Sequence, residues 1–235
     1  MPEAQSHYQP APVAIHPEPS HEHPEVHPWL QHHFDTMEQQ QEAGTFGMWL
    51  FLVTEILFFG GMFCAFFVFR SWYFDGFKEA HHHLDKVMGA INTVVLIASS
   101  LTMALGVRSA QRSKKTLTVA MLAMTIGFAC VFLVIKYFEY SHKFHEGFLP
   151  GASLAVEKFQ TGYDAGVFFA VYFMMTGVHG LHVVIGIGLI TWILVRASKG
   201  QFSSRYYAPV EGVGLYWHLV DLIWIYLFPL LYLVG

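Results

Sequence analysis

Long apolar windows, separated by short charged connections, make up the chain from residue 46 to its end. Each window reaches the roughly 20 residues that a helix needs to cross the hydrocarbon core of a bilayer. Charged residues stand directly outside the windows, where they can reach the membrane interface; they are Arg70, Lys86, Arg108, Lys115, Lys136, Arg196 and Glu211. The pattern predicts an all-α membrane protein, a bundle of five transmembrane helices over residues 46–69, 87–107, 116–135, 165–195 and 212–235.

The first 45 residues differ in composition, with seven histidines, no lysine or arginine, and the Pro/Glu-rich run IHPEPSHEHPEVHP. Such a segment cannot bury enough apolar surface to form a packed core. We therefore expect a disordered or extended tail over residues 1–45, followed by a transmembrane domain over residues 46–235. The tail histidines, and the run His81–His83, are candidate metal ligands, but a solvated tail is the simpler interpretation.

The overall composition supports the membrane class. Of all residues, 54% are hydrophobic and only 13% are charged. The formal net charge of -4 is small and the basic residues are spread among loops, so we expect no nucleic-acid partner. Cys64 and Cys130 lie in separate apolar windows without CxxC spacing, which indicates neither a disulfide framework nor a thiolate metal site.

The loops show a charge asymmetry. The two short connections on the N-terminal side are basic, with almost no acidic residues; they hold Arg108, Arg112, Lys114, Lys115, Arg196, Lys199 and Arg205. The opposite connections hold six basic residues, but these are spread over longer segments and mixed with seven acidic ones. By the positive-inside rule, we expect the N-terminus in the cytoplasm and the C-terminus outside.

One carboxylate, Glu55, stands in the otherwise uncharged run FLVTEILFFGG, near the middle of the first window. An ionisable group at that depth is costly unless it is protonated, paired or turned toward a bundle interior, so Glu55 is a candidate functional residue. Its apolar neighbours in the sequence favour the neutral acid. The plainer alternative is a protonated glutamate that only hydrogen-bonds a neighbouring helix.

Polar residues recur at helical spacing in three other windows. The stripes consist of Tyr172, Thr176, His179, His182 and Gly186; of Glu211, Gly214, His218 and Asp221; and of Asn92, Ser99, Thr102 and Gly106. Residues three or four apart share one helix face, and small and hydrogen-bonding residues are what membrane helices use to pack together. Packing alone therefore explains all three stripes, and His218 can hydrogen-bond Asp221 or a facing stripe.

Two sharper hypotheses remain open for the same residues. His179, His182, His218 and Asp221 have the residue types of a metal site, and histidines on separate helices can be axial haem ligands. An autonomous transporter or proton channel is the other hypothesis, although the five windows show no inverted repeat and no broken helix pair.

Five segments resemble, in the same order, the helices of the cytochrome c oxidase subunit III family. They are GMWLFLVTEILFFGG, INTVVLIASSLTMALG, VIKYFEY, TGVHGLHVVIG and VEGVGLYWHLVDLIWIYLFPLLYL. The resemblance covers roughly residues 44–235, and the patterns HGxH and YWHxVDxxW make it specific.

The resemblance implies an accessory subunit of a proton-pumping haem-copper oxidase in aerobic respiration, in a bacterial plasma membrane. Haem and copper are then held by partner subunits, and this chain has no cofactor, no metal and no catalytic residue of its own. The implied partners are the catalytic subunit I, subunit II, bound phospholipids and a respiratory supercomplex.

Residue roles follow from the resemblance only at matching positions. Glu55 matches the buried carboxylate that reacts with a hydrophobic carbodiimide in the family, and it is implied to support oxygen access, lipid binding or proton uptake. The polar residues implied to fix helix packing and lipid contacts are His179, His182, His218, Asp221, Glu139 and Asn92. Longer family members have two further helices before the first window, and this chain resembles the short five-helix form. The electron donor stays open, because quinol oxidases and proteins associated with nitric oxide reductases carry a similar subunit.

Overall fold

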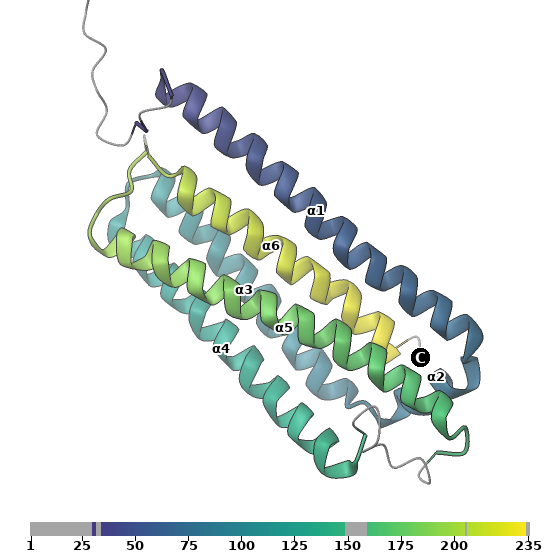
Figure 1. The fold of residues 1–235 in the computed structure, drawn as a ribbon. Coiled ribbons are helices and arrows are strands. Elements are labelled where there is room, and N and C mark those ends of the chain that lie inside the picture. The colour runs from purple at the N-terminus through teal and green to yellow at the C-terminus, as the bar shows by residue number, and fades with distance from the viewer. Residues whose placement is uncertain (1–29, 32–33, 149–158, 205, 234–235) are drawn as a thin grey trace, which may run out of the picture. The chain divides into compact units, whose positions relative to one another are not determined.

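The computed structural model describes residues 30–31, 34–148, 159–204 and 206–233 (Figure 1). Its helices are α1 (Met37–Trp72), α2 (Phe74–Ala80), the 3-10 turn η1 (His81–His83), α3 (Lys86–Gln111), α4 (Lys115–Glu146), α5 (Tyr163–Ser198), α6 (Ala208–Phe228) and the π-helical turn η3 (Pro229–Leu233). Across these described ranges, strand-like pairing is limited to an isolated bridge between Ser203 and Tyr206. The predicted all-helical class is confirmed.

Five of the helices are long and apolar enough to cross a membrane: α1, α3, α4, α5 and α6 continued through Leu233. The predicted windows coincide with these helices, which confirms the five-helix prediction. The helices run further than the windows because they continue into polar residues at their ends. Lys136, which we expected at a membrane interface, therefore lies well inside α4.

The chain divides into two compact units, Met1–Glu42 and Ala43–Gly235. In the first unit, α1 begins within the segment that we expected to belong to the tail. Thr36 caps this helix, since its Oγ1 accepts a hydrogen bond from the N–H of Gln39 at 3.1 Å. The tail histidines proposed as metal ligands lie outside the described residues.

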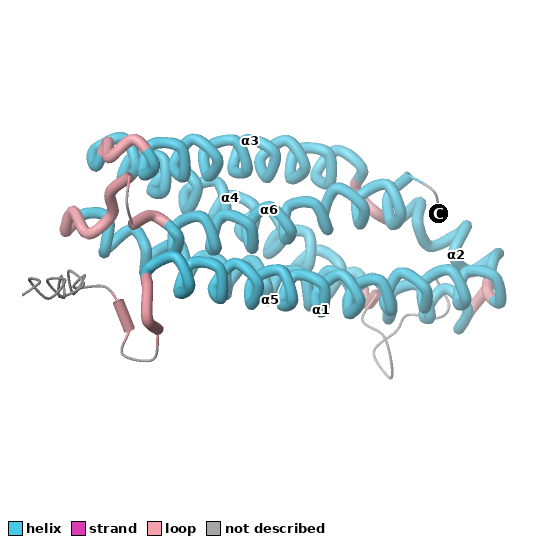
Figure 2. Tube along the Cα trace, turned by 90° about the horizontal axis from the view of Figure 1, so that it is seen from above, coloured by secondary structure: helices cyan, strands magenta, loops and turns pink. Residues whose placement is uncertain are grey.

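The second unit contains a four-helix bundle. α3 packs on α4 and α6, and α5 packs on the same two helices, so the four enclose one core. Figure 2 shows α3, α6 and α5 running alongside one another. Large aromatic side chains fill the core, and Trp217 packs directly on the backbone of α5 at Gly186, where a Cβ atom would lie 2.5 Å from the indole ring. The glycine of the α5 stripe therefore makes room for a tryptophan of α6.

From residue 43 onward, α1 contacts the other helices mainly through aromatic side chains. Phe51 meets Tyr216 of α6, and Phe66 meets Phe77 of α2, with ring centroids 6.0 Å and 5.5 Å apart. Much of its remaining surface is apolar and exposed, including Leu57, which is 69% exposed. This is the surface expected of a helix that faces lipid or another membrane subunit.

A carboxylate holds the segment before α5 against α2. Glu79 accepts hydrogen bonds from the backbone N–H groups of Gln160 and Thr161, at 2.7 Å and 2.9 Å, and from the Thr161 hydroxyl at 2.7 Å. The Thr161 hydroxyl and these backbone donors favour the charged form, so they lower the pKa of Glu79 from its usual 4.5.

Protonation of Glu79 is expected to weaken this attachment. Because the folded-state pKa lies below the unfolded-state value, the carboxylate stabilises the fold above the unfolded pKa, and the effect disappears as pH falls through the folded pKa. We expect the melting temperature of the wild type to exceed that of Glu79→Gln at neutral pH, with the difference shrinking as the solution is acidified toward and below the usual pKa. A difference that stays constant with pH would contradict this explanation.

Candidate functional site

Glu55 of α1 and His182 of α5 form a half-buried pair. Oε2 of Glu55 lies 3.0 Å from Nε2 of His182, and 18% of the glutamate and 14% of the histidine side chain are exposed. The ring of Phe59 meets the imidazole edge-on, with centroids 5.1 Å apart. Among the described residues of α1 from position 43, no other side chain hydrogen-bonds a different helix. The partner that the sequence of α1 could not reveal is thus supplied by the polar stripe of α5.

The hydrogen bonds of His182 fix how many protons the pair holds. Its Nδ1 lies 2.8 Å from the carbonyl oxygen of Val178, which can only accept, so Nδ1 carries a hydrogen and donates it. The contact between Nε2 and Glu55 then requires one further proton, on the carboxyl or on the imidazole. Either arrangement leaves the pair with zero net charge. This removes most of the cost of placing two ionisable groups between apolar helices.

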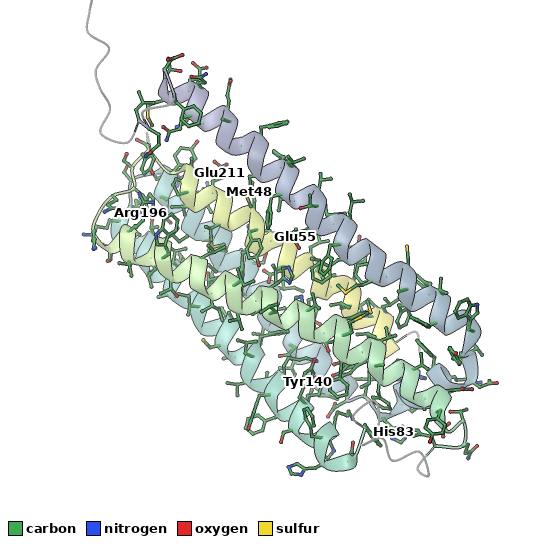
Figure 3. All side chains as sticks on the ribbon, viewed as in Figure 1. Met48, Glu55, His83, Tyr140, Arg196 and Glu211 are labelled. Atoms are coloured by element: carbon green, nitrogen blue, oxygen red, sulfur yellow. The ribbon has the colours of Figure 1, made fainter. Side chains whose placement is uncertain are left out.

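An open pocket of about 330 Å³ lies beside the pair. Its walls come from α1, α5 and α6, and Figure 3 shows Met48 and Glu55 between α1 and α6. Besides Glu55 and His182, the lining is Met48, Phe51, Ile185, Leu189, Gly212, Val213 and Tyr216. The pocket is therefore an apolar space with one proton-holding pair in its wall.

A second buried network joins α4, α5 and η3. Lys136 donates hydrogen bonds to Glu139 at 2.9 Å, to the hydroxyl of Tyr172 at 3.2 Å and to that of Tyr232 at 3.0 Å. Both tyrosine hydroxyls in turn donate to the other oxygen of Glu139. Only 9% of the Lys136 side chain and 2% of the Glu139 side chain are exposed. Lys136 does not reach the membrane interface as we expected, because all three of its N–H donors have partners inside the bundle.

The remaining candidate residues have separate surroundings. Nδ1 of His218 lies 2.7 Å from the hydroxyl of Ser100 on α3, so the histidine pairs with a facing helix rather than with Asp221. The ring of His179 is buried between Phe132 and Trp224, with centroids 5.6 Å and 5.2 Å away.

Asn92 and Asp221 are buried, with at most 2% of either residue exposed. In the part of the chain that the structure describes, the polar side-chain atoms of Asn92 and His179 have no hydrogen-bond partner. Asp221 faces Ser100. These residues belong to the core between the helices, as a packing role requires.

The structure does not bring the four proposed metal or haem ligands together. His182 turns to α1 and His218 to α3, while His179 lies against aromatic rings. Within the described ranges, no three His, Cys, Asp or Glu side chains are grouped so that they could hold a metal ion. In the run His81–His83, the ring centroids of His81 and His82 lie 4.0 Å apart, but the ring of His83 packs against Phe148 and Phe159 instead of joining them.

Sequence reasoning missed Lys136 and Tyr232 as partners of Glu139. A signal was present, because Lys136 and Glu139 stand three residues apart in KYFEY, a spacing that lets the two side chains meet on one helix face. The tyrosines come from other helices, and no local pattern indicates which tyrosine of many would reach the pair.

Comparison with known proteins decides the family. The family described as Cytochrome c oxidase subunit III matches residues 30–235. The chain belongs to this family. It is a subunit III of a haem-copper terminal oxidase, and the resemblance seen in the five segments is confirmed.

Relatives within the subunit III family come from oxidases of different kinds. The chain is 31% identical to "Cytochrome c oxidase subunit 3" of Synechocystis over 80% of its own length and 75% of that protein. It is 32% identical to "Quinol oxidase subunit 3" of Bacillus subtilis over 85% and 92% of the two chains. "Heme-copper oxidase subunit I+III" of Aeropyrum pernix is 31% identical over 80% of this chain, which spans only 22% of that longer protein.

The Lys136–Glu139 network is expected to contribute to the stability of this subunit III. Lys136→Met leaves Glu139 as an unpaired buried charge and should cost about 3–5 kcal/mol of unfolding free energy. The double variant Lys136→Met/Glu139→Gln removes both charges while keeping an acceptor for the tyrosines, so it should be more stable than Lys136→Met alone. Denaturant unfolding in detergent measures the unfolding free energies of both variants.

The control is Lys78→Gln, which replaces an exposed lysine of α2 and should change the unfolding free energy by less than about 0.5 kcal/mol. The charges would not be coupled if the double variant lost as much unfolding free energy as Lys136→Met and Glu139→Gln lose together.

Proposed function

We propose that this chain is the accessory, cofactor-free subunit III of a proton-pumping oxidase of aerobic respiration. In this role it supports the stability, the lipid and oxygen access, and the proton uptake of the catalytic subunit. The observation that carries the proposal is the family match over residues 30–235. Catalysis then takes place in partner subunits, which hold the haem and copper.

Subunit I is the proposed direct neighbour. The name of the Aeropyrum relative places subunits I and III in one chain, which supports close association of the two. The exposed apolar surface of α1 offers area for such a contact, with Trp49 and Leu57 more than half exposed. Subunit II, bound phospholipids and a respiratory supercomplex complete the proposed surroundings, in a bacterial plasma membrane with the N-terminus in the cytoplasm.

Cytochrome c is the proposed electron donor of the complex, and quinol is the alternative. Relatives named for each kind of oxidase are equally similar to this chain, at 31% and 32% identity. The donor binds to other subunits, so it is those subunits that distinguish the two cases.

Glu55 and His182 are the proposed functional pair of the subunit. Their one shared proton can move between carboxyl and imidazole without leaving net charge in the apolar surroundings. A group of this kind, beside a pocket open to small apolar molecules, can influence proton uptake or oxygen access in an adjacent subunit. The proposal assigns Glu55 and His182 a supporting role and no catalytic one.

Purification of the chain from its native membrane tests the assignment. In mild detergent, we expect large partner subunits and a haem absorbance band to copurify, and the band to leave with the partners when they are stripped away. Mass spectrometry of the partners then identifies a cytochrome c or a quinol oxidase. A haem band that stays with the isolated chain would contradict the cofactor-free assignment, and a colourless chain without partners would favour a transporter.

Replacement of Glu55 tests the pair itself. In the assembled oxidase, Glu55→Gln should reduce the number of turnovers before inactivation severalfold, because glutamine keeps the shape of the side chain but cannot exchange a proton. Oxygen-consumption traces measure this number. His182→Gln should have a similar effect, and the double variant should be no worse than either single one, since both remove the same proton-sharing unit.

The matched control is Glu211→Gln, which neutralises an exposed glutamate in the first turn of α6 (Figure 3). It should leave the number of turnovers unchanged. An unchanged number in Glu55→Gln as well would restrict the pair to helix packing.

A further inference from the structure

One end of the helical bundle carries an excess of positive charge. In the described residues from 108 to 115 and from 196 to 207, six side chains are basic and none is acidic: Arg108, Arg112, Lys114, Lys115, Arg196 and Lys199. All except Arg196, which is half-buried, are exposed. We refer to these six residues as the basic end. Glu211, in the first turn of α6, is the next acidic residue along the chain.

The basic end is one surface, although it comes from two connections far apart in the sequence. Oγ of Ser113, between α3 and α4, accepts a hydrogen bond from the N–H of Ser204, between α5 and α6, at 2.9 Å. Lys115 lies against Gly200, where a Cβ atom would be 3.8 Å from the lysine Nζ. Charges that the sequence distributes over two loops therefore act together.

Aromatic rings hold Arg196, one residue of the basic end, in a defined position at the end of the apolar helices. The guanidinium of Arg196 lies 4.9 Å from the ring of Trp192 and 5.4 Å from that of Phe202, and its Nε donates a hydrogen bond to Gln201 at 2.8 Å. Trp192 itself is 50% exposed. Exposed tryptophan next to arginine, directly beyond apolar helices, is typical of the headgroup level of a bilayer. Figure 3 shows Arg196 at the opposite end of the helices from Tyr140 and His83.

We propose that the basic end binds the phosphate groups of anionic phospholipids. Clustered lysines and arginines at the headgroup level attract anionic lipids, and each such residue adds to the attraction. Arginine and lysine N–H groups also donate charge-assisted hydrogen bonds to phosphate oxygens. A lipid is favoured over an acidic protein because these cations flank the ends of membrane-spanning helices, where headgroups are always present. The inference concerns a surface remote from Glu55 and does not depend on its proposed role.

The experiment compares two pairs of exposed lysines in the assembled oxidase. The complex is reconstituted in nanodiscs of phosphatidylglycerol and phosphatidylcholine, and native mass spectrometry counts the lipids of each kind that stay bound. The wild type should retain phosphatidylglycerol preferentially. Lys114→Gln/Lys115→Gln should weaken that retention roughly thirtyfold, given the usual contribution of each lysine at an anionic surface. Lys78→Gln/Lys86→Gln removes the same charge from exposed positions of α2 and α3, where Asp75, Glu79 and Asp85 leave no excess of positive charge, and should leave retention unchanged.

Three results would overturn the proposal. The first is a wild type that retains both lipids equally. A crosslink between the basic end and an acidic partner protein would then identify that protein as the occupant. The second is retention that is unchanged in Lys114→Gln/Lys115→Gln. The third is an equal loss in both lysine pairs, which would show a general effect of net charge. Equal melting temperatures of the variants exclude unfolding as the cause, and wild-type retention should fall in roughly 1 M salt, which screens exposed charges.

Discussion

A polar group inside an apolar helix has to find its partner within the protein, because hydrocarbon offers none. At two places the bundle meets this requirement by bringing complementary groups together in neutral sets, whereas the buried polar atoms of Asn92 and His179 have no hydrogen-bond partner among the described residues. Lys136 and Glu139 neutralise one another, and two tyrosine hydroxyls complete their hydrogen bonds. Glu55 and His182 achieve neutrality differently, by sharing one proton. These hydrogen bonds link α1 to α5, and α4 to α5 and η3, in addition to the aromatic packing between the helices.

The two neutral sets have different chemical possibilities. In the Lys136–Glu139 set all three donors of the lysine are engaged and only 2% of the Glu139 side chain is exposed, although Lys136 also lines an open pocket of about 480 Å³. Glu55 and His182 stand in the wall of an open pocket, and their proton has two alternative positions. A set whose hydrogen bonds are all engaged stabilises, whereas a set with a movable proton can also respond to its surroundings. This contrast is why the proposed functional role falls on Glu55 rather than on the more deeply buried Glu139.

The sequence predicted the helices well and the contacts between them poorly. Uninterrupted apolar windows identify membrane spans because the bilayer sets their length, and the polar stripe on α5 correctly indicated residues that face the core. The pairing of Glu55 with His182 joins residues 127 positions apart, and a helical pattern contains no information about which distant helix lies opposite. The misplacement of Lys136 has the same origin. Its charge marked the end of an apolar window, although a glutamate three residues later and tyrosines from elsewhere allow it to remain inside the bundle.

The position of Tyr232 has a consequence for the order in which the protein is made. Lys136 and Glu139 leave the ribosome together on one helix, so they can enter the membrane as a neutral dipole. Tyr172 follows on α5, and Tyr232 arrives only after α6 has been synthesised, in the turn η3. The ion pair must therefore remain incompletely coordinated while two further helices are inserted. Tyr232 can complete the network only after α6 has been synthesised, which couples the final packing of α4 to the placement of η3.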